Sequence, residues 1–199
     1  MVEPLGHPYK VHMNFDSFSH GQIQSKLWLC EELENHIPAN QTVAILGGWH
    51  NVLGFMMLTR RPSHYRRIIN VDTDLAAIAT ANKLCDAWIV NSVDTTNVLN
   101  IVGDCNSETI IINSANVIIN CSVEHFESTE WFFNLPKGTL VCIQSSDVID
   151  ENAPWSVKSP NPDMKTLIER FPMEHIFMGT KRIQYAHFGY NRFMLIGRT

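Results

Sequence analysis

Short apolar runs, each bounded by polar residues or turns, recur along the chain. Runs of this length that are apolar throughout are typical of strands buried on both faces of a sheet. They predict strands at residues 42–46, 67–71, 87–90, 117–120 and 139–143. Two more strands are predicted near the end of the chain, joined by a loop rich in aromatic residues and histidine, at residues 175–180 and 191–196.

The segments between these runs have the apolar spacing of helices. They predict helices at residues 22–36, 49–58, 75–84 and 163–171, the third of them capped by Asp74. Residues 98–102 indicate a short helix, and residues 109–113 indicate a turn of strand or the lead into the fourth strand. Strands that alternate with helices and end in a hairpin favour a doubly wound, Rossmann-like α/β fold. Its sheet is expected to be mainly parallel and seven-stranded, with an antiparallel C-terminal strand.

The most informative local pattern joins the first two strands. The first strand ends in Gly47 and Gly48, a helix follows, and the second strand ends in Asp72. This arrangement is typical of the nucleoside-binding half of a doubly wound fold, because glycine lets the backbone approach a ligand and a carboxylate accepts hydrogen bonds from a ribose. The alternatives are a tight turn without any ligand and an acid that only caps a helix or a strand end. A P-loop is excluded, because no Gly-Lys-Ser/Thr follows the glycines.

Composition narrows the class of protein. At 199 residues the chain fits a single domain, which we expect to span residues 1–199 with an irregular segment at residues 1–20. The net charge of −5 argues against a broadly basic nucleic-acid surface. No segment approaches the roughly 20 apolar residues of a membrane span, so no membrane association is expected. The five cysteines lack CxxC spacing and the N-terminus lacks signal-peptide features, which favours buried thiols and a cytoplasmic location.

The order of elements resembles the class I S-adenosylmethionine-dependent methyltransferases over about residues 20–199. In that family a glycine-rich turn after the first strand lies against the methionine part of the cofactor, and Gly47 and Gly48 match that turn. The family's second-strand acid, which holds the ribose, falls on Asp72. An acid after the third strand contacts the adenine; Asp94 occupies that place, with Asp104 as its competitor. The resemblance therefore implies S-adenosyl-L-methionine as cofactor, held by Gly47, Gly48, Trp49, Asp72, Thr73, Asp94 and Asn120.

Two departures from the family pattern concern the methionine end. The family usually carries an acid within the first strand, where this chain has Ile45, and a G-x-G-x-G run, where residues 47–51 are Gly-Gly-Trp-His-Asn. The missing carboxylate normally helps to position the cofactor's amino group. Either the methionine end is bound differently here, or the cofactor is another adenosine compound. Residues 120–125 are similar to small stand-alone methyltransferase-like proteins encoded by phages.

Two titratable residues follow the fourth strand, where a methyl donor would meet its acceptor. His125 is suited to remove a proton from the acceptor, and Glu124 could orient it or pair with a cationic substrate. The alternative is that both simply begin a helix. As in the family, residues 16–26 are expected to fold over the cofactor or else to form the polar face of the first helix, the candidates being Phe18, His20, Gln22 and Lys26.

The function predicted from these patterns is methyl transfer to an N or O atom of a small or medium acceptor. The loop at residues 147–162 and the connector at residues 185–190 would shape the acceptor pocket. Nucleic acid is the less favoured acceptor, because Asn120 does not begin a Pro-Pro-aromatic signature and no Pro-Cys pair occurs. Nine histidines show neither HExxH nor a Cys/His cluster with zinc spacing, so no metal is expected. The alternatives are a non-catalytic binding or assembly protein and an enzyme that uses another adenosine-containing cofactor.

Overall fold

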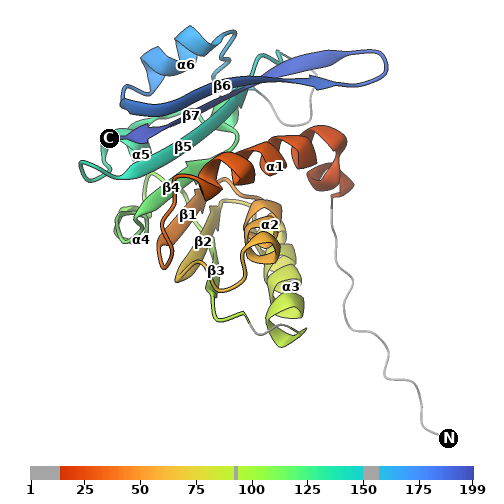
Figure 1. The fold of residues 1–199 in the computed structure, drawn as a ribbon, viewed down its shortest axis with the longest axis vertical. Helices are drawn as coiled ribbons and strands as arrows, with labels where there is room; N and C mark the ends of the chain where they lie inside the picture. Colours follow the sequence, from red (N-terminus) through yellow and green to blue (C-terminus); the bar gives the residue numbers. More distant parts are fainter. Residues whose placement is uncertain (1–13, 92–93, 150–156) are drawn as a thin grey trace, which may run out of the picture.

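A seven-stranded sheet organises the computed structural model, which describes residues 14–91, 94–149 and 157–199. The strand order is β3-β2-β1-β4-β5-β7-β6, and β7 runs antiparallel to both of its neighbours (Figure 1). The predicted fold class is therefore confirmed. The strands are β1 (Thr42–Leu46), β2 (Arg67–Asp72), β3 (Asn97–Val102), β4 (Val117–Asn120), β5 (Leu140–Ser146), β6 (Glu174–Gln184) and β7 (Gly189–Arg198).

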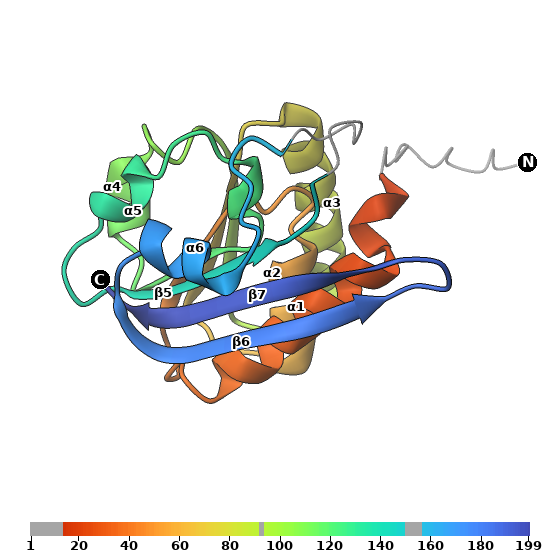
Figure 2. The same cartoon turned by 90° about the horizontal axis from the view of Figure 1, so that it is seen from above.

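Helices cover both faces of this sheet (Figures 1 and 2). One face carries α1, α2 and α3, and the other carries α4, α5 and α6. The helices are α1 (His20–Glu34), α2 (Val52–Arg60), α3 (Leu75–Asn91), α4 (Thr109–Asn113), α5 (Glu130–Phe133) and α6 (Met164–Arg170). Two short 3-10 helices complete the elements, η1 (Phe15–Phe18) within the segment expected to be irregular and η2 (Val123–His125) after β4.

Strand β1 shows why the central strands are apolar throughout. Successive side chains of a strand point to opposite faces. Val43 and Ile45 join the core on the α1 and α2 side, whereas Ala44 and Leu46 join the core on the α5 and α6 side. All four are at most 1% exposed. A strand buried on both faces needs no polar alternation, and this is the pattern from which it was predicted.

The third strand was predicted in the wrong place. Residues 87–90 belong to α3, whereas the strand is formed by Asn97–Val102, part of which was predicted to be a helix. Cys85 is buried in α3, and one turn later Trp88 packs edge-on against Phe55 of α2, with ring centroids 5.8 Å apart. The apolar run thus belongs to the last turns of a long helix, in which Trp88 is half-buried against α2. Strand β3 pairs only with β2 at the edge of the sheet, so it lacks the apolar signature of a central strand.

The predicted helix at residues 163–171 and the predicted cap of α3 are confirmed, whereas the prediction for residues 109–113 was wrong. The helix predicted at residues 163–171 is α6, whose N-cap Asp163 accepts a hydrogen bond from the Thr166 backbone N–H at 2.7 Å. Asp74 caps α3 as predicted, because its Oδ1 accepts from the backbone N–H groups of Ala76 and Ala77. Residues 109–113, left between two strand interpretations, form α4.

An aromatic cluster fixes α5 and α6 against the sheet. The ring of Phe132 lies 5.2 Å from that of Phe171 and 5.9 Å from that of Trp131, and all three side chains are buried. The next residue, Phe133, is 62% exposed.

Phe132→Ala is expected to lower the free energy of unfolding by about 3–5 kcal/mol, because it removes a buried ring and leaves a cavity. Phe133→Ala, in the same helix, is expected to lower it by less than about 1 kcal/mol. Urea denaturation of both variants tests this. Equal losses in the two variants would contradict the packing described.

Candidate functional site

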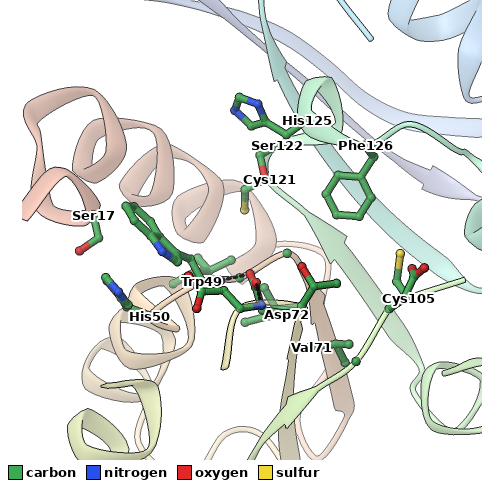
Figure 3. Close-up of a pocket in the computed structure, with 18 of the residues that line it drawn as sticks. Ser17, Trp49, His50, Val71, Asp72, Cys105, Cys121, Ser122, His125 and Phe126 are labelled. Carbon is green, nitrogen blue, oxygen red and sulfur yellow. Dashed lines mark hydrogen bonds between the residues drawn. The ribbon is translucent and has the colours of Figure 1, made fainter. Parts of the chain in front are cut away.

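A cavity of about 850 Å³ opens where the carboxyl ends of β1, β2, β3 and β4 meet (Figure 3). Ligands of open α/β sheets bind at this edge, where the strand order reverses. Residues at each of these strand ends line it: Gly47 and Gly48 after β1, Asp72 and Thr73 at β2, Gly103 and Asp104 after β3, and Cys121 and Ser122 after β4. Of the residues predicted to hold a cofactor, the structure brings Gly47, Gly48, Trp49, Asp72 and Thr73 together in this pocket.

The turn from β1 to α2 has an unusual backbone. Gly47, Trp49 and Asn51 all have positive φ, at 62°, 52° and 55°. For the two non-glycine residues this conformation costs about 1–2 kcal/mol each and persists only where the surroundings enforce it. Two hydrogen bonds do so: Gly47 N donates to the Val71 carbonyl at 2.8 Å, and Trp49 N donates to Asp72 Oδ2 at 2.8 Å (Figure 3).

Both glycines of the turn are closely packed. A Cβ at Gly47 would lie 2.8 Å from the ring of Phe126, and one at Gly48 would lie 2.1 Å from Oδ1 of Asn70. No larger side chain fits at either position without moving a neighbour. The turn therefore depends on glycine both for its backbone conformation and for its close approach to β2 and to the segment after β4.

A network of asparagine amides lies beneath the turn and was not predicted. Asn70 of β2 donates from Nδ2 to the Trp49 carbonyl at 3.2 Å and to Asn100 Oδ1 at 3.3 Å. Asn51 donates to the same Asn100 oxygen at 3.0 Å, and Asn100 donates to Asn82 at 3.0 Å. The signal in the sequence is an asparagine at matching positions of two neighbouring strands, since Asn70 pairs with Asn100 in register. These amides support the turn from the sheet.

The predicted adenine contact must be corrected. Asp94 precedes β3 and therefore lies at the opposite end of that strand from the pocket, where it accepts hydrogen bonds from the backbone N–H groups of Ser63 and Thr96 at 2.9 Å each. Its assignment depended on a third strand at residues 87–90, which are helical. The residue that follows β3 into the pocket is its competitor, Asp104, whose Oδ1 accepts from the Asn106 backbone N–H at 2.9 Å.

The structure does not bring Glu124 or Asn120 into the pocket lining. Glu124 forms a salt bridge of 2.9 Å with Arg192 of β7, and the two side chains are 3% and 10% exposed. Ser146 donates to the same carboxylate at 3.2 Å, and Arg192 donates to Ser25 of α1 at 2.9 Å and also to the Cys121 carbonyl. This ion-pair network connects η2, β5, β7 and α1. Sequence reasoning had no pattern that linked residues so far apart in the chain.

Asn120 has a local role after β4. Its buried side chain accepts a hydrogen bond from the Ser122 backbone N–H at 3.0 Å, which holds the chain as it turns towards the pocket. His125, by contrast, lines the pocket together with Ser122 and Phe126, and all three are visible on its β4 side (Figure 3). Of the two residues predicted to address the acceptor, the structure therefore brings only His125 to the pocket.

His50 also lines the pocket, although it was not predicted. Its ring stacks on that of Trp49 with centroids 4.5 Å apart and an interplanar angle of 17°. Burial lowers the pKa of its imidazole, while the carboxylates of Asp74 and Asp72 act in the opposite direction. A stacked pair of rings thus lines the pocket beside the glycine turn. In the sequence, the only indication that His50 lies at the pocket is its position next to the glycine turn.

The N-terminal segment reaches the pocket as expected, but only through some of its candidates. Gln22 and Lys26 of α1 line it, together with Asp16 and Ser17 of η1. Phe18 and His20 do not belong to that lining.

The tip of the β6–β7 hairpin holds the start of α1. His20 packs edge-on against Tyr185, with ring centroids 5.4 Å apart. The Tyr185 hydroxyl accepts a hydrogen bond from the Gly21 N–H at 2.7 Å. The predicted connector at residues 185–190 thus contacts α1, and the predicted loop at residues 147–162 lies partly outside the described residues.

Within residues 14–91, 94–149 and 157–199, no three His, Cys, Asp or Glu side chains gather as a metal site would require. Over the same ranges, no helix has both the length and the apolar character needed to cross a membrane.

Glu124→Gln is expected to lower the free energy of unfolding by about 3–5 kcal/mol, because it leaves the Arg192 guanidinium buried without its counter-charge. The matched control is Glu169→Gln, which breaks the exposed pair with Lys165 and is expected to change stability by less than about 1 kcal/mol. Urea denaturation measures both. A Glu124→Gln variant as stable as the control would show that the pair is not structural.

No family model and no curated protein matches the chain, but solved structures do. A methyltransferase from Methanosarcina mazei shares 10% identity over 84% of this chain and 96% of its own, with a TM-score of 0.66. The N-methyltransferase NodS from Bradyrhizobium japonicum, in complex with S-adenosylhomocysteine, shares 12% over 96% and 93%, with a TM-score of 0.66. A magnesium protoporphyrin IX methyltransferase from Synechocystis, with bound S-adenosylmethionine, shares 7% over 96% and 86%, with a TM-score of 0.64. The chain has the fold of the class I S-adenosylmethionine-dependent methyltransferases.

Proposed function

We propose that this protein binds S-adenosyl-L-methionine and transfers its methyl group to an N or O atom of a small or medium-sized acceptor. One observation carries the proposal: the glycine turn and two carboxylates, Asp72 and Asp104, meet in one pocket at the ends of adjacent parallel strands. The fold supports it, because structures with the same fold hold S-adenosylhomocysteine or S-adenosylmethionine.

The pocket fits a ligand of this kind. Its volume of about 850 Å³ lies in the range of small-molecule and cofactor sites. Both oxygens of Asp72 already accept backbone N–H groups, from Trp49 and Asp74. These bonds fix the carboxylate while leaving it lone pairs for the hydroxyls of a ribose. Asp104 is similarly fixed by Asn106 and is the carboxylate that we assign to the adenine end.

When bound, the cofactor supplies an electrophilic methyl group on its sulfonium. The chain's own residues then have to position an acceptor and take up its proton. His125 lines the pocket next to Ser122, and an imidazole is suited to accept that proton near neutral pH. We assign Glu124 a positioning role, because its carboxylate is paired with Arg192 and holds η2, the 3-10 helix that carries His125.

A second candidate is a different adenosine-containing ligand. It rests on Ile45, which stands in β1 where an acid would contact the amino group of S-adenosylmethionine. The nucleoside half of the pocket would be the same for both candidates. They differ only at the end formed by β1, β4 and α1.

The proposal is tested by isothermal titration with S-adenosylmethionine and S-adenosylhomocysteine, with NADH as control ligand. We expect micromolar binding of S-adenosylmethionine and S-adenosylhomocysteine and no binding of NADH. If neither sulfur-containing ligand binds, the proposed function is overturned.

Asp104→Asn is expected to weaken S-adenosylhomocysteine binding about 10-fold or more, because a carboxylate acceptor is lost. Asp94→Asn is the matched control and is expected to leave affinity unchanged, since Asp94 lies at the far end of β3. Equal effects would contradict the adenine assignment.

A further inference from the structure

The pocket carries a cation at the end where an acid was expected. Ile45 occupies the place of the strand-one carboxylate, and its side chain cannot pair with an ammonium group. Lys26, on α1, lines the same pocket as Ile45, Gly47 and Cys121. Cys121, the residue after β4, is among the groups close enough to act on the Lys26 amine. This end of the pocket therefore carries a basic side chain, whereas the family pattern places an acidic one there.

Lys26 lacks a carboxylate partner among the described residues. Its ammonium donates a hydrogen bond to the neutral Gln22 side chain, and it takes part in none of the described salt bridges. Asp16 of η1 is an acid that acts on it, although no salt bridge joins the two among the described residues. Burial lowers the pKa of this amine to about 8, which reflects the cost of holding a charge out of water without a counter-ion.

The other cationic side chains near this pocket are neutralised. Lys158, also in the lining, pairs with Glu127 at 2.5 Å, and Arg192 pairs with Glu124 at 2.9 Å. An incoming anion would thus meet, within the described lining, a lysine that forms no salt bridge, on the α1 side of the pocket.

We propose that Lys26 binds the carboxylate of the ligand's amino-acid group, so that this pocket selects adenosyl ligands that carry that carboxylate. The inference rests on the proposed function and specifies how its methionine end is recognised. A charge-assisted hydrogen bond from ammonium to carboxylate supplies the partner that the protein itself does not provide. In this pocket Lys26 would bind the carboxylate of the ligand's amino-acid group, whereas in the family pattern an acid in the first strand binds its ammonium group. An acid in β1 is then not needed, which accounts for the apolar Ile45 at that position.

The test compares two ligands that share the adenosine half. S-adenosylhomocysteine carries the amino-acid group, and 5′-methylthioadenosine lacks it. Lys26→Met is expected to weaken S-adenosylhomocysteine binding by about 10-fold to 100-fold while changing 5′-methylthioadenosine binding less than about twofold. Lys165→Met on α6, whose side chain is 82% exposed and which lies outside the pocket lining, is the matched control and should change neither.

Each outcome separates the inference from the proposed function. If wild type binds both ligands and Lys26→Met weakens them equally or not at all, the carboxylate assignment is overturned and the adenosyl site stands. If wild type binds neither ligand, the proposed function fails and the inference fails with it.

The melting temperature of Lys26→Met is expected to equal or exceed that of wild type, because the substitution removes a buried charge that forms no salt bridge. A lowered melting temperature would instead assign the lysine to folding, and the Lys26→Gln variant then repeats the ligand comparison.

The pH dependence provides a second readout. The charged or titratable groups that act on Lys26 are Cys121 after β4, Arg192 of β7, Asp16 of η1 and Cys30 of α1. As pH rises above about 8, the free lysine loses its proton and with it the attraction for a carboxylate. The preference of wild type for S-adenosylhomocysteine over 5′-methylthioadenosine should therefore decline between pH 7 and pH 9.5. In Lys26→Arg, which stays protonated, it should decline less, and equal declines would overturn the assignment.

Discussion

The hydrogen bond from the Trp49 backbone N–H to the Asp72 carboxylate is the contact on which the candidate site depends. It joins the turn after β1 to the end of β2, and it holds Trp49 in a left-handed conformation that a tryptophan does not adopt by preference. The same carboxylate accepts from Asp74 N, and Asp74 caps α3. One side chain thus sets the backbone of the turn, the start of the next helix and the acidic floor of the pocket.

The turn is also supported from the sheet by uncharged groups. Asparagine side chains from β2, β3 and the turn itself share hydrogen bonds beneath Gly48. Amides can donate and accept at once, so they link strands without placing a charge among buried strands. On the other side of the pocket, Glu124 and Arg192 are both charged and nearly buried, but as a salt bridge they carry no net charge. Different polar groups therefore support the two sides of the pocket, uncharged amides on one side and an ion pair on the other.

Sequence patterns located the central strands and the C-terminal hairpin but misplaced β3, at one edge of the sheet. Strand β1 and the glycine turn were predicted because a strand buried on both faces has a distinctive apolar run. Strand β3 is only partly buried and carries no such run, and the misplaced strand put Asp94 in place of Asp104 at the predicted edge of the pocket. Glu124 was predicted from its place after β4, but Arg192, which determines its role, lies 68 residues further along the chain. Long-range pairing of this kind leaves no local signal.

The ties that hold α1 span most of the chain. The Gly21 N–H meets the Tyr185 hydroxyl across 164 residues, and Ser25 meets Arg192 across 167. Loop closure over such distances is slow, and a chain folds from its N-terminus as it is synthesised. Helix α1 therefore docks fully only after the β6–β7 hairpin has formed. A nascent chain that ends after β5 would have the strand ends that line the pocket without a docked α1 opposite them, so the complete cavity requires segments that lie more than 160 residues apart.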